Sequence, residues 1–207
     1  MTRIYLVRHV QAMGNVRRVF QGHTDEPPSP LGEKQLDYLS EFFRDISLDK
    51  VYYSPLIRTA RTAHAVAKYH DIPLVPEEGV IEIFAGLFEN KTWEELFRDY
   101  PDEMSHWGPD FQNFRAKGGE SFREVYERAV NTMTRLAEEN DGKTVAVCTH
   151  GGFMRAFMTF VCFGDAEKMS VREFDKNASV GLVEYENGKF NLIFENNRDF
   201  LPDELKN

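Results

Sequence analysis

Short apolar runs alternate along the chain with longer stretches in which an apolar residue returns every three or four positions. The short runs have the length and the β-branched or aromatic content of buried strands, and the longer stretches have the single apolar face of a packed helix. Strands are predicted at 4–7, 51–53 and 144–148, with weaker candidates at 72–75 and 80–83. This alternation predicts an α/β fold with a mostly parallel sheet, joined by right-handed crossovers and flanked by helices on both faces.

Four short sequences have the composition of a helix start. Ser29-Pro30 and Ser54-Pro55 are each interpreted as a capping serine followed by proline at the first helical position, where the missing N–H is not needed. Thr92 to Glu95 and Ser121 to Glu124 have the spacing of capping boxes, in which side chains satisfy the free N–H groups of the first turn. The helix after Ser121 is predicted to run to about Glu139.

The end of the chain has a different pattern from the rest. Asn187-Gly188 separates two strand-like runs at 179–185 and 190–194, and this dipeptide favours the tight turn of a C-terminal β-hairpin. The residues after Arg198 resemble a polar tail. Near the other end, the segment 14–30 is rich in turn-forming residues and is predicted to be a loop.

An inserted helical cap is predicted at about 84–117, where aromatic residues are frequent. These side chains either pack on one another or form a lid that shapes a substrate pocket. The chain 1–207 is predicted to be one α/β domain, since 207 residues suit a single core and no linker interrupts them. Hydrophobic residues make up 42% of the chain and 17 residues are Phe, which is typical of a globular protein with an aromatic core.

Composition excludes several classes of function. A net charge of −9 argues against nucleic-acid binding, which needs a broad basic surface. The two cysteines, Cys148 and Cys162, have neither metal-site nor disulfide spacing, and no HxxxH or HExxH pattern indicates zinc. No apolar run has the length of a membrane span and no signal-like segment opens the chain, so we expect a cytoplasmic protein without membrane, metal or cofactor. The pattern specifies no oligomeric state.

The candidate chemistry lies at the ends of the predicted strands. Arg8 and His9 follow the first strand, Arg58 follows the second, and His150 with two glycines follows the strand at 144–148. Because the carboxyl ends of parallel strands meet at one edge of a sheet, we expect these side chains to converge. Planar guanidinium groups match the oxygens of a phosphoryl group, and positive neighbours keep an imidazole neutral and nucleophilic. The helix that begins at Gly151 would add an anion site at its N-terminus, with His150 as a further donor.

With these motifs in order, the chain resembles the histidine phosphatase superfamily, in the branch that contains the cofactor-dependent phosphoglycerate mutases and related phosphatases. The resemblance covers nearly the whole chain. It rests on the block from Arg8 to Asn15, Phe20-Gln21-Gly22 with Asp25 and Pro27, Gly32 and Gln35, Ser54-Pro55-Leu56 with Arg58 and Thr62-Ala63, Glu82-Ile83 with Gly86 and Phe88-Glu89, Gly118-Gly119-Glu120-Ser121, and Thr149-His150-Gly151.

The resemblance implies hydrolysis of a small phosphorylated metabolite through a phosphohistidine, without metal. By position, His9 resembles the nucleophile and Glu82 the general acid that protonates the leaving oxygen, while Glu77, Glu78 and Glu89 compete for the acid's role on sequence alone. The remaining site residues implied are Arg8, Arg58 and His150 around the phosphoryl group, with Asn15, Gln21, Gly22 and Gly151 as further substrate contacts. The other histidines, His23, His64, His70 and His106, are interpreted as structural or surface residues.

Two alternatives remain open at this point. A mutase would use the same intermediate but return the phosphoryl group to a bound product, and the short chain favours a phosphatase. A phospho-ligand-binding protein with little turnover is suggested by two departures from the family pattern, Val10 and Ala12. Together with Arg61, Ala85 and Asn90, these departures leave open a reduced rate or an unusual substrate. Val10 is the most significant of these, since a β-branched residue directly after the nucleophile would be strained if its φ were positive.

Overall fold

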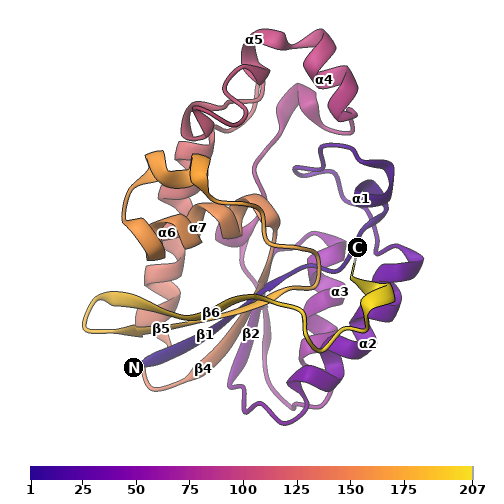
Figure 1. Cartoon of the computed structure of the whole chain (residues 1–207). Helices are drawn as coiled ribbons and strands as arrows, with labels where there is room; N and C mark the ends of the chain where they lie inside the picture. Colours follow the sequence, from indigo (N-terminus) through magenta and orange to yellow (C-terminus); the bar gives the residue numbers. More distant parts are fainter. Residues whose placement is uncertain (207) are drawn as a thin grey trace.

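A six-stranded sheet forms the centre of the computed structural model, which describes residues 1–206 (Figure 1). The strand order is β3-β2-β4-β1-β5-β6; the first four strands are parallel, β5 pairs antiparallel with β1, and β6 pairs antiparallel with β5. This confirms the predicted mostly parallel sheet. The strands are β1 (Thr2–Arg8), β2 (Lys50–Tyr53), β3 (Leu74–Pro76), β4 (Thr144–Thr149), β5 (Val180–Glu186) and β6 (Lys189–Asn197).

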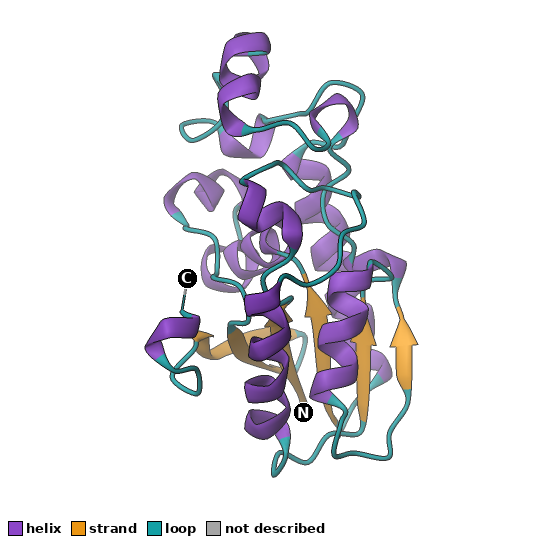
Figure 2. Cartoon of the chain, turned by 90° about the vertical axis from the view of Figure 1, so that its right-hand side faces the viewer, coloured by secondary structure: helices purple, strands orange, loops and turns teal. Residues whose placement is uncertain are grey.

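Helices cover both faces of the sheet, as Figure 2 shows from the side. One face packs against α2 (Pro30–Phe43) and α3 (Ile57–Val66), and the other against α6 (Phe122–Glu139) and α7 (Gly151–Phe163). Successive side chains of β1 alternate between the two layers: Ile4 and Leu6 join the core beneath α6 and α7, and Tyr5 and Val7 join the core beneath α2 and α3. The β1 strand is therefore buried on both sides, which explains its unbroken apolar run.

The predicted helix starts are confirmed at three of four positions. Ser29 Oγ accepts a hydrogen bond from Gly32 N at 3.0 Å, and the capping boxes after Thr92 and Ser121 both form. The prediction for Ser54-Pro55 is wrong, because α3 begins at Ile57 and its first N–H donates to the carboxylate of Asp25 at 2.6 Å. A side chain from a distant loop thus caps this helix, and Ser54 is left for another contact.

Two predictions for irregular segments are also corrected. The expected loop at 14–30 contains a short helix, α1 (Met13–Arg17). The weak strand at 72–75 corresponds to β3, but the one at 80–83 does not form, since the structure has a 3₁₀ turn at Glu78–Val80 followed by irregular chain. Its carbonyl groups bond to side chains instead of a neighbouring strand, beginning with Val80 O, which accepts from Thr149 Oγ1 at 2.6 Å.

The predicted cap contains α4 (Trp93–Asp99) and α5 (Pro101–Met104), which lie at the top of Figure 1. Trp107 lies at the centre of its aromatic side chains, with ring centroids 4.8 Å from Trp93, 4.8 Å from Phe111 and 4.9 Å from Phe114. Phe111 and Phe114 are buried, and they belong to the same apolar cluster as Ile4 and Leu6 of the sheet. The cap aromatics therefore do pack on one another and extend the core.

The chain ends in the predicted hairpin, where Asn187 and Gly188 have φ of 53° and 78°. The residues that follow are not a free polar tail as predicted. Leu201 and Leu205 are buried, and Gln35 Nε2 of α2 donates to Leu205 O at 2.9 Å. Among residues 1–206, none of the helices has both the length and the apolar character that spanning a membrane requires.

Candidate active site

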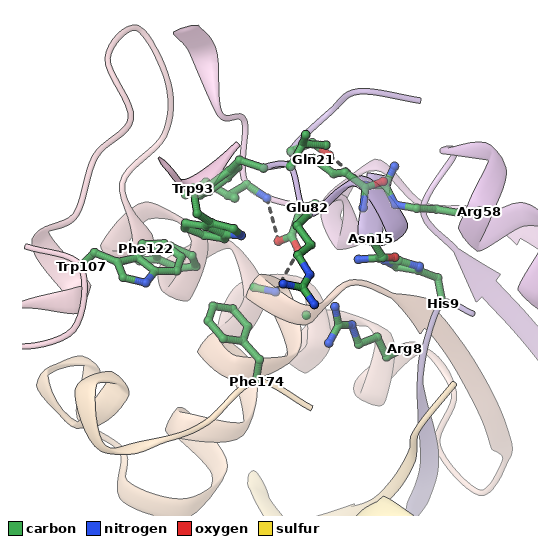
Figure 3. Close-up of a pocket in the computed structure, with 17 residues that line it drawn as sticks. Arg8, His9, Asn15, Gln21, Arg58, Glu82, Trp93, Trp107, Phe122 and Phe174 are labelled. Carbon is green, nitrogen blue, oxygen red and sulfur yellow. Dashed lines mark hydrogen bonds between the residues drawn. The ribbon is translucent and has the colours of Figure 1, made fainter. Parts of the chain in front are cut away.

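A pocket of about 370 Å³ opens where the parallel strands end (Figure 3). Its polar side chains and its aromatic side chains lie at opposite sides, with Glu82 between them. The structure brings eight of the nine predicted site residues to the wall of this pocket, whereas His150 lies behind it. The eight are Arg8, His9, Asn15, Gln21, Gly22, Arg58, Glu82 and Gly151.

A hydrogen bond to the backbone of the next residue orients the imidazole of His9, and its surroundings keep the ring neutral. His9 N donates to Thr149 O at 2.9 Å, which joins the end of β1 to the end of β4, and the side chain is 4% exposed. Its Nδ1 lies 2.7 Å from Val10 O, and because a carbonyl only accepts, Nδ1 carries the proton. Burial, Arg58 and Arg8 hold the pKa of His9 well below its usual value. The neutral ring therefore leaves Nε2 with a free electron pair.

Val10 does not strain the backbone next to His9. It is buried and is not among the described residues with positive φ. Its N–H donates to Thr62 Oγ1 of α3 at 3.2 Å. The backbone strain expected for valine at this position is therefore absent.

Two guanidinium groups flank His9 without a carboxylate partner. Arg58 is buried in the first turn of α3 and donates to Gly22 O at 2.9 Å and Thr24 O at 2.8 Å, while the half-buried Arg8 donates to the backbone carbonyl of Asp175. Within residues 1–206 neither forms an ion pair, and the Nε of each is buried without a hydrogen bond. Burial lowers the pKa of both groups, that of Arg58 to about 10. Carboxylates such as Glu82 act on both cations without pairing with them, so a bound anion would supply the direct partner that each lacks.

His150 stands behind His9, with the two ring centroids 5.2 Å apart. It is the N-cap residue of α7 and is fully buried. Its Nε2 lies 2.7 Å from Ser54 Oγ, and its Nδ1 has no partner in the described chain. Burial, with Arg58 next, holds the pKa of His150 well below its usual value. Ser54, which the sequence suggested as a helix cap, is therefore the residue that orients His150.

The carboxylate of Glu82 occupies the N-terminus of α7. It accepts from Gly152 N at 2.8 Å, Phe153 N at 3.1 Å and Ile83 N at 2.9 Å. A Cβ at Gly152 would lie 2.4 Å from Glu82 Oε1, so only glycine permits this approach. The anion site predicted at this helix start thus holds an internal carboxylate on two of its N–H groups, while Gly151 remains on the pocket wall beside Arg8.

The rival acids lie elsewhere. Glu77 pairs with Arg135, and Glu89 accepts from the N–H groups of His23 and Thr24. Neither these nor Glu78 line the pocket in the part of the chain that the structure describes. Glu82 is thus the one of the four predicted candidates with access to a bound substrate.

Asn15 and Gln21 line the pocket beside the α1 helix. Asn15 Oδ1 accepts from Ala12 N at 2.9 Å, which turns the amide of Asn15 back over the helix start. Gln21 packs directly on Gly14, where a Cβ would lie 2.3 Å from Gln21 Cδ. The missing side chain at Gly14 therefore makes room for Gln21 in the wall.

The opposite side of the pocket is an aromatic wall made of Phe20, Trp93, Trp107, Phe122 and Phe174. Sequence reasoning did not find Phe174 or the exposed Arg18, which also lines the pocket and has φ of 56°. Phe174 lies after α7 and is brought in by tertiary packing, with Arg155 stacked 4.6 Å from its ring centre. Nothing local in the sequence marks either residue.

The remaining histidines do not form a metal site. His23 and His70 bond to backbone carbonyls, and His106 pairs with Asp110. Among residues 1–206, no three His, Cys, Asp or Glu side chains are grouped so that they could hold a metal ion.

Comparison with known proteins gives concordant matches. The family model described as histidine phosphatase superfamily (branch 1) matches residues 4–198. The chain is 30% identical over 197 residues to phosphoserine phosphatase 1 of Hydrogenobacter thermophilus, covering 95% of this chain and 92% of the other. It is 29% identical over 192 residues to the uncharacterized phosphatase PhoE of Bacillus subtilis, covering 93% of each. The solved structure of Bacillus stearothermophilus YhfR superimposes with a TM-score of 0.91 at 26% identity, covering 97% of this chain and 99% of that one.

Proposed function

Because the chain belongs to the histidine phosphatase superfamily and is a phosphomonoester hydrolase, we propose that it hydrolyses a small phosphorylated metabolite through a phosphohistidine at His9, without metal. One observation carries the proposal. A neutral imidazole with an unprotonated Nε2 shares a pocket with two guanidinium groups that have no carboxylate partner, Arg8 and Arg58. A phosphomonoester dianion supplies the missing negative charge, and its oxygens accept charge-assisted hydrogen bonds.

In the first step, Nε2 of His9 attacks phosphorus while the bond from phosphorus to the leaving oxygen breaks. The Nδ1–H···O=C bond to Val10 keeps the ring oriented and stabilises the positive charge that develops on it. Arg8 and Arg58 hold the charge that spreads over the equatorial oxygens, and His150 behind His9 adds a donor through Nδ1, which has no other partner in the described chain. A bound dianion beside Glu82 favours the protonated carboxyl, which gives its proton to the leaving oxygen.

In the second step, water attacks the phosphohistidine from the side that the alcohol has left. Glu82, now a carboxylate, takes a proton from this water, and the electron pair of the phosphorus–nitrogen bond returns to Nε2 of His9. Inorganic phosphate leaves and the starting state is restored. Besides the substrate and water, both steps use only side chains of this protein.

The leaving group is expected to contact the aromatic wall. Trp93 and Trp107 offer ring surface to the part of the substrate that departs, at the side of the pocket opposite Arg8 and His9. Such surface favours an apolar or planar alcohol over a highly charged one. We therefore expect aryl and other apolar phosphomonoesters to be hydrolysed with higher kcat/KM than phosphorylated hydroxy acids.

The test compares His9→Ala with the wild type on p-nitrophenyl phosphate. We expect the loss of at least about 10³-fold in activity, because removing a nucleophile leaves only binding and charge stabilisation. His64→Ala, on the exposed side of α3, is the control and should keep full activity. Alkaline quenching after mixing with ³²P-labelled substrate should leave label on the wild type and none on His9→Ala. Equal hydrolysis by His9→Ala contradicts the proposal.

A second incubation, with 3-phosphoglycerate, distinguishes hydrolysis from phosphoryl transfer back to product. Release of inorganic phosphate is expected, with or without added 2,3-bisphosphoglycerate. Rapid isomerisation to 2-phosphoglycerate without phosphate release would instead establish a mutase.

A further inference from the structure

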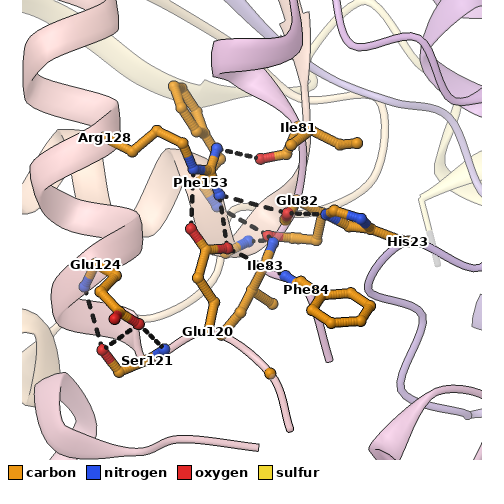
Figure 4. Close-up of polar contacts among 12 residues, drawn as sticks. His23, Ile81, Glu82, Ile83, Phe84, Glu120, Ser121, Glu124, Arg128 and Phe153 are labelled. Atoms are coloured by element: carbon orange, nitrogen blue, oxygen red, sulfur yellow. Dashed lines mark hydrogen bonds and ion pairs between the residues drawn. The ribbon is translucent and has the colours of Figure 1, made fainter. Parts of the chain in front are cut away.

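The sequence motif Gly118-Gly119-Glu120-Ser121 contributes nothing to the wall of the pocket, yet its glutamate contacts the segment that carries Glu82 (Figure 4). Glu120 pairs there with Arg128 of α6. We propose that Arg128, held by Glu120, is a positioning residue that fixes the backbone around Glu82 and so sets the place of its carboxyl group. The inference rests on the role of Glu82 as the general acid proposed above.

Arg128 bonds to three carbonyl groups on the segment that leads to Glu82. Its NH1 donates to Gly79 O at 3.0 Å and to Ile81 O at 2.7 Å, and its NH2 reaches Glu82 O at 3.4 Å. His23 Nε2 donates to the same carbonyl of Glu82 at 2.9 Å. Residues 81–85 belong to no helix or strand, so these side chains take the place of the backbone pairing that a strand would have.

Glu120 ties Arg128 to the other side of Glu82. Its two oxygens accept parallel hydrogen bonds from Arg128 Nε and NH2, both at 3.0 Å. Its Oε2 also accepts from Phe84 N at 3.1 Å, and its own N–H donates to Phe84 O at 2.9 Å. Both side chains are only 22% exposed. The pair therefore holds the chain before and after Glu82 to the start of α6.

The motif itself is explained by this arrangement. A Cβ at Gly119 would lie 2.3 Å from Phe84 O, so glycine permits the close approach of the two segments. Ser121 then caps α6, which places Arg128 two turns along the helix from Glu120. A lysine at 128 would carry the same charge but lacks the planar fork that reaches several carbonyls and a carboxylate together.

The expected consequence concerns proton donation more than binding. Glu82 accepts from the N–H groups of Gly152 and Phe153 at its present backbone position, and a displacement of about 1 Å in a catalytic group can lower the rate by about 10²-fold. Proton donation matters most when the leaving oxygen is basic. A misplaced acid should therefore slow substrates with alkoxide leaving groups and spare those that leave as stabilised phenolates.

The test measures kcat/KM on benzyl phosphate and p-nitrophenyl phosphate, which are similar in size but differ in the basicity of the leaving oxygen. For Arg128→Met we expect a loss of about 10- to 100-fold on benzyl phosphate and of less than about threefold on p-nitrophenyl phosphate. Arg128→Lys and Glu120→Gln should shift the ratio in the same direction, and Arg128→Lys serves if Arg128→Met does not fold. Arg123→Met, at an exposed position of the same helix, should leave the ratio unchanged.

Glu82→Gln provides the reference for the loss of the acid, and thermal unfolding checks each variant. If Glu82→Gln changes the substrate ratio but the Arg128 variants do not, or if they slow both substrates equally, the inference is overturned. If Glu82→Gln itself leaves the ratio unchanged, the proposed acid is wrong. The two failures are thus distinguished by one set of enzymes.

Discussion

Replacing Arg58 with methionine removes a buried guanidinium group and leaves an apolar chain in its place. Burial lowers the pKa of Arg58 from its ordinary value to about 10, so the folded protein disfavours this cation by about 3 kcal/mol at neutral pH. The lower pKa belongs to the folded state, so the penalty is complete below pH 10 and disappears only as the pH rises towards the ordinary pKa of arginine. Arg58→Met is free of this penalty.

The same substitution removes the hydrogen bonds that Arg58 donates to Gly22 O and Thr24 O. Bonds from a charged donor contribute about 1.5–3 kcal/mol each, so losing both costs about 3–6 kcal/mol. Removing the burial penalty of about 3 kcal/mol offsets part of this loss, and the net destabilisation is about 0–3 kcal/mol. For a chain of this length that corresponds to a drop in Tm of at most about 10 °C. The variant should therefore remain folded.

Activity should change far more than stability. Loss of one preorganised donor to the phosphoryl oxygens lowers kcat/KM by about 10²–10³-fold. Orthovanadate, which resembles a phosphoryl group, should stabilise the wild type by about 2.7 kcal/mol at a hundred times its Kd, and raise Tm by roughly 5–10 °C. At that concentration Arg58→Met should show little shift.

The control is Arg61→Met, one turn further along α3, which removes an exposed guanidinium that pairs with Glu33. It should keep both its activity and the full response to orthovanadate. If Arg58→Met behaves like Arg61→Met in both assays, Arg58 does not bind the phosphoryl group. That result would refute the role assigned to its buried guanidinium.

Three further measurements test other parts of the site. Because the pKa of His9 lies well below 6.5 in the folded protein, only the unfolded chain takes up this proton as the pH falls beneath 6.5, and the free energy of unfolding drops with it. His9→Gln should make that drop shallower by up to about 1.4 kcal/mol per pH unit in urea denaturation, and an unchanged slope would argue against a neutral His9. Ser54→Ala leaves Nε2 of His150 without its partner and should lower stability by about 1–3 kcal/mol and reduce kcat/KM, whereas wild-type values for both would show that this contact is dispensable. Prolonged chelation should leave phosphatase activity intact, since His9 and the arginines supply attack and charge stabilisation; activity that is lost and then restored by a divalent ion refutes metal independence.

The sequence was sufficient to predict that the residues at the strand ends converge, because parallel strands bring their carboxyl ends to one edge of the sheet independently of loop conformation. Arg8 and His9 after β1, and Gly151 after β4, could be assigned to one edge of the sheet from the order of apolar runs alone. Arg58 followed from the same rule for β2 and α3. The assignment of Glu82 depended on the family resemblance, since the sequence alone does not distinguish the four carboxylates in that region.

The errors arose where a tertiary contact replaced a local one. Ser54-Pro55 has the composition of a helix start, but His150 takes the serine hydroxyl and Asp25 caps α3 from another loop. The apolar run at 80–83 has the composition of a strand, but Arg128 bonds to the carbonyls at Gly79 and Ile81 that a strand partner would need. Local pattern cannot reveal a hydrogen-bond partner dozens of residues away.

Two rings of the aromatic wall come from a part of the chain that carries none of the proposed phosphoryl-binding residues. Trp93 and Trp107 belong to the cap, whereas Arg8 and His9 are fixed by the ladder of β1 with β4. Under the proposed mechanism, a substitution in the cap would change which alcohol is released while His9 keeps its position. A library aimed at new substrates should therefore vary 84–117 and leave the strand ends unchanged, since the same bond-breaking machinery can serve many metabolites.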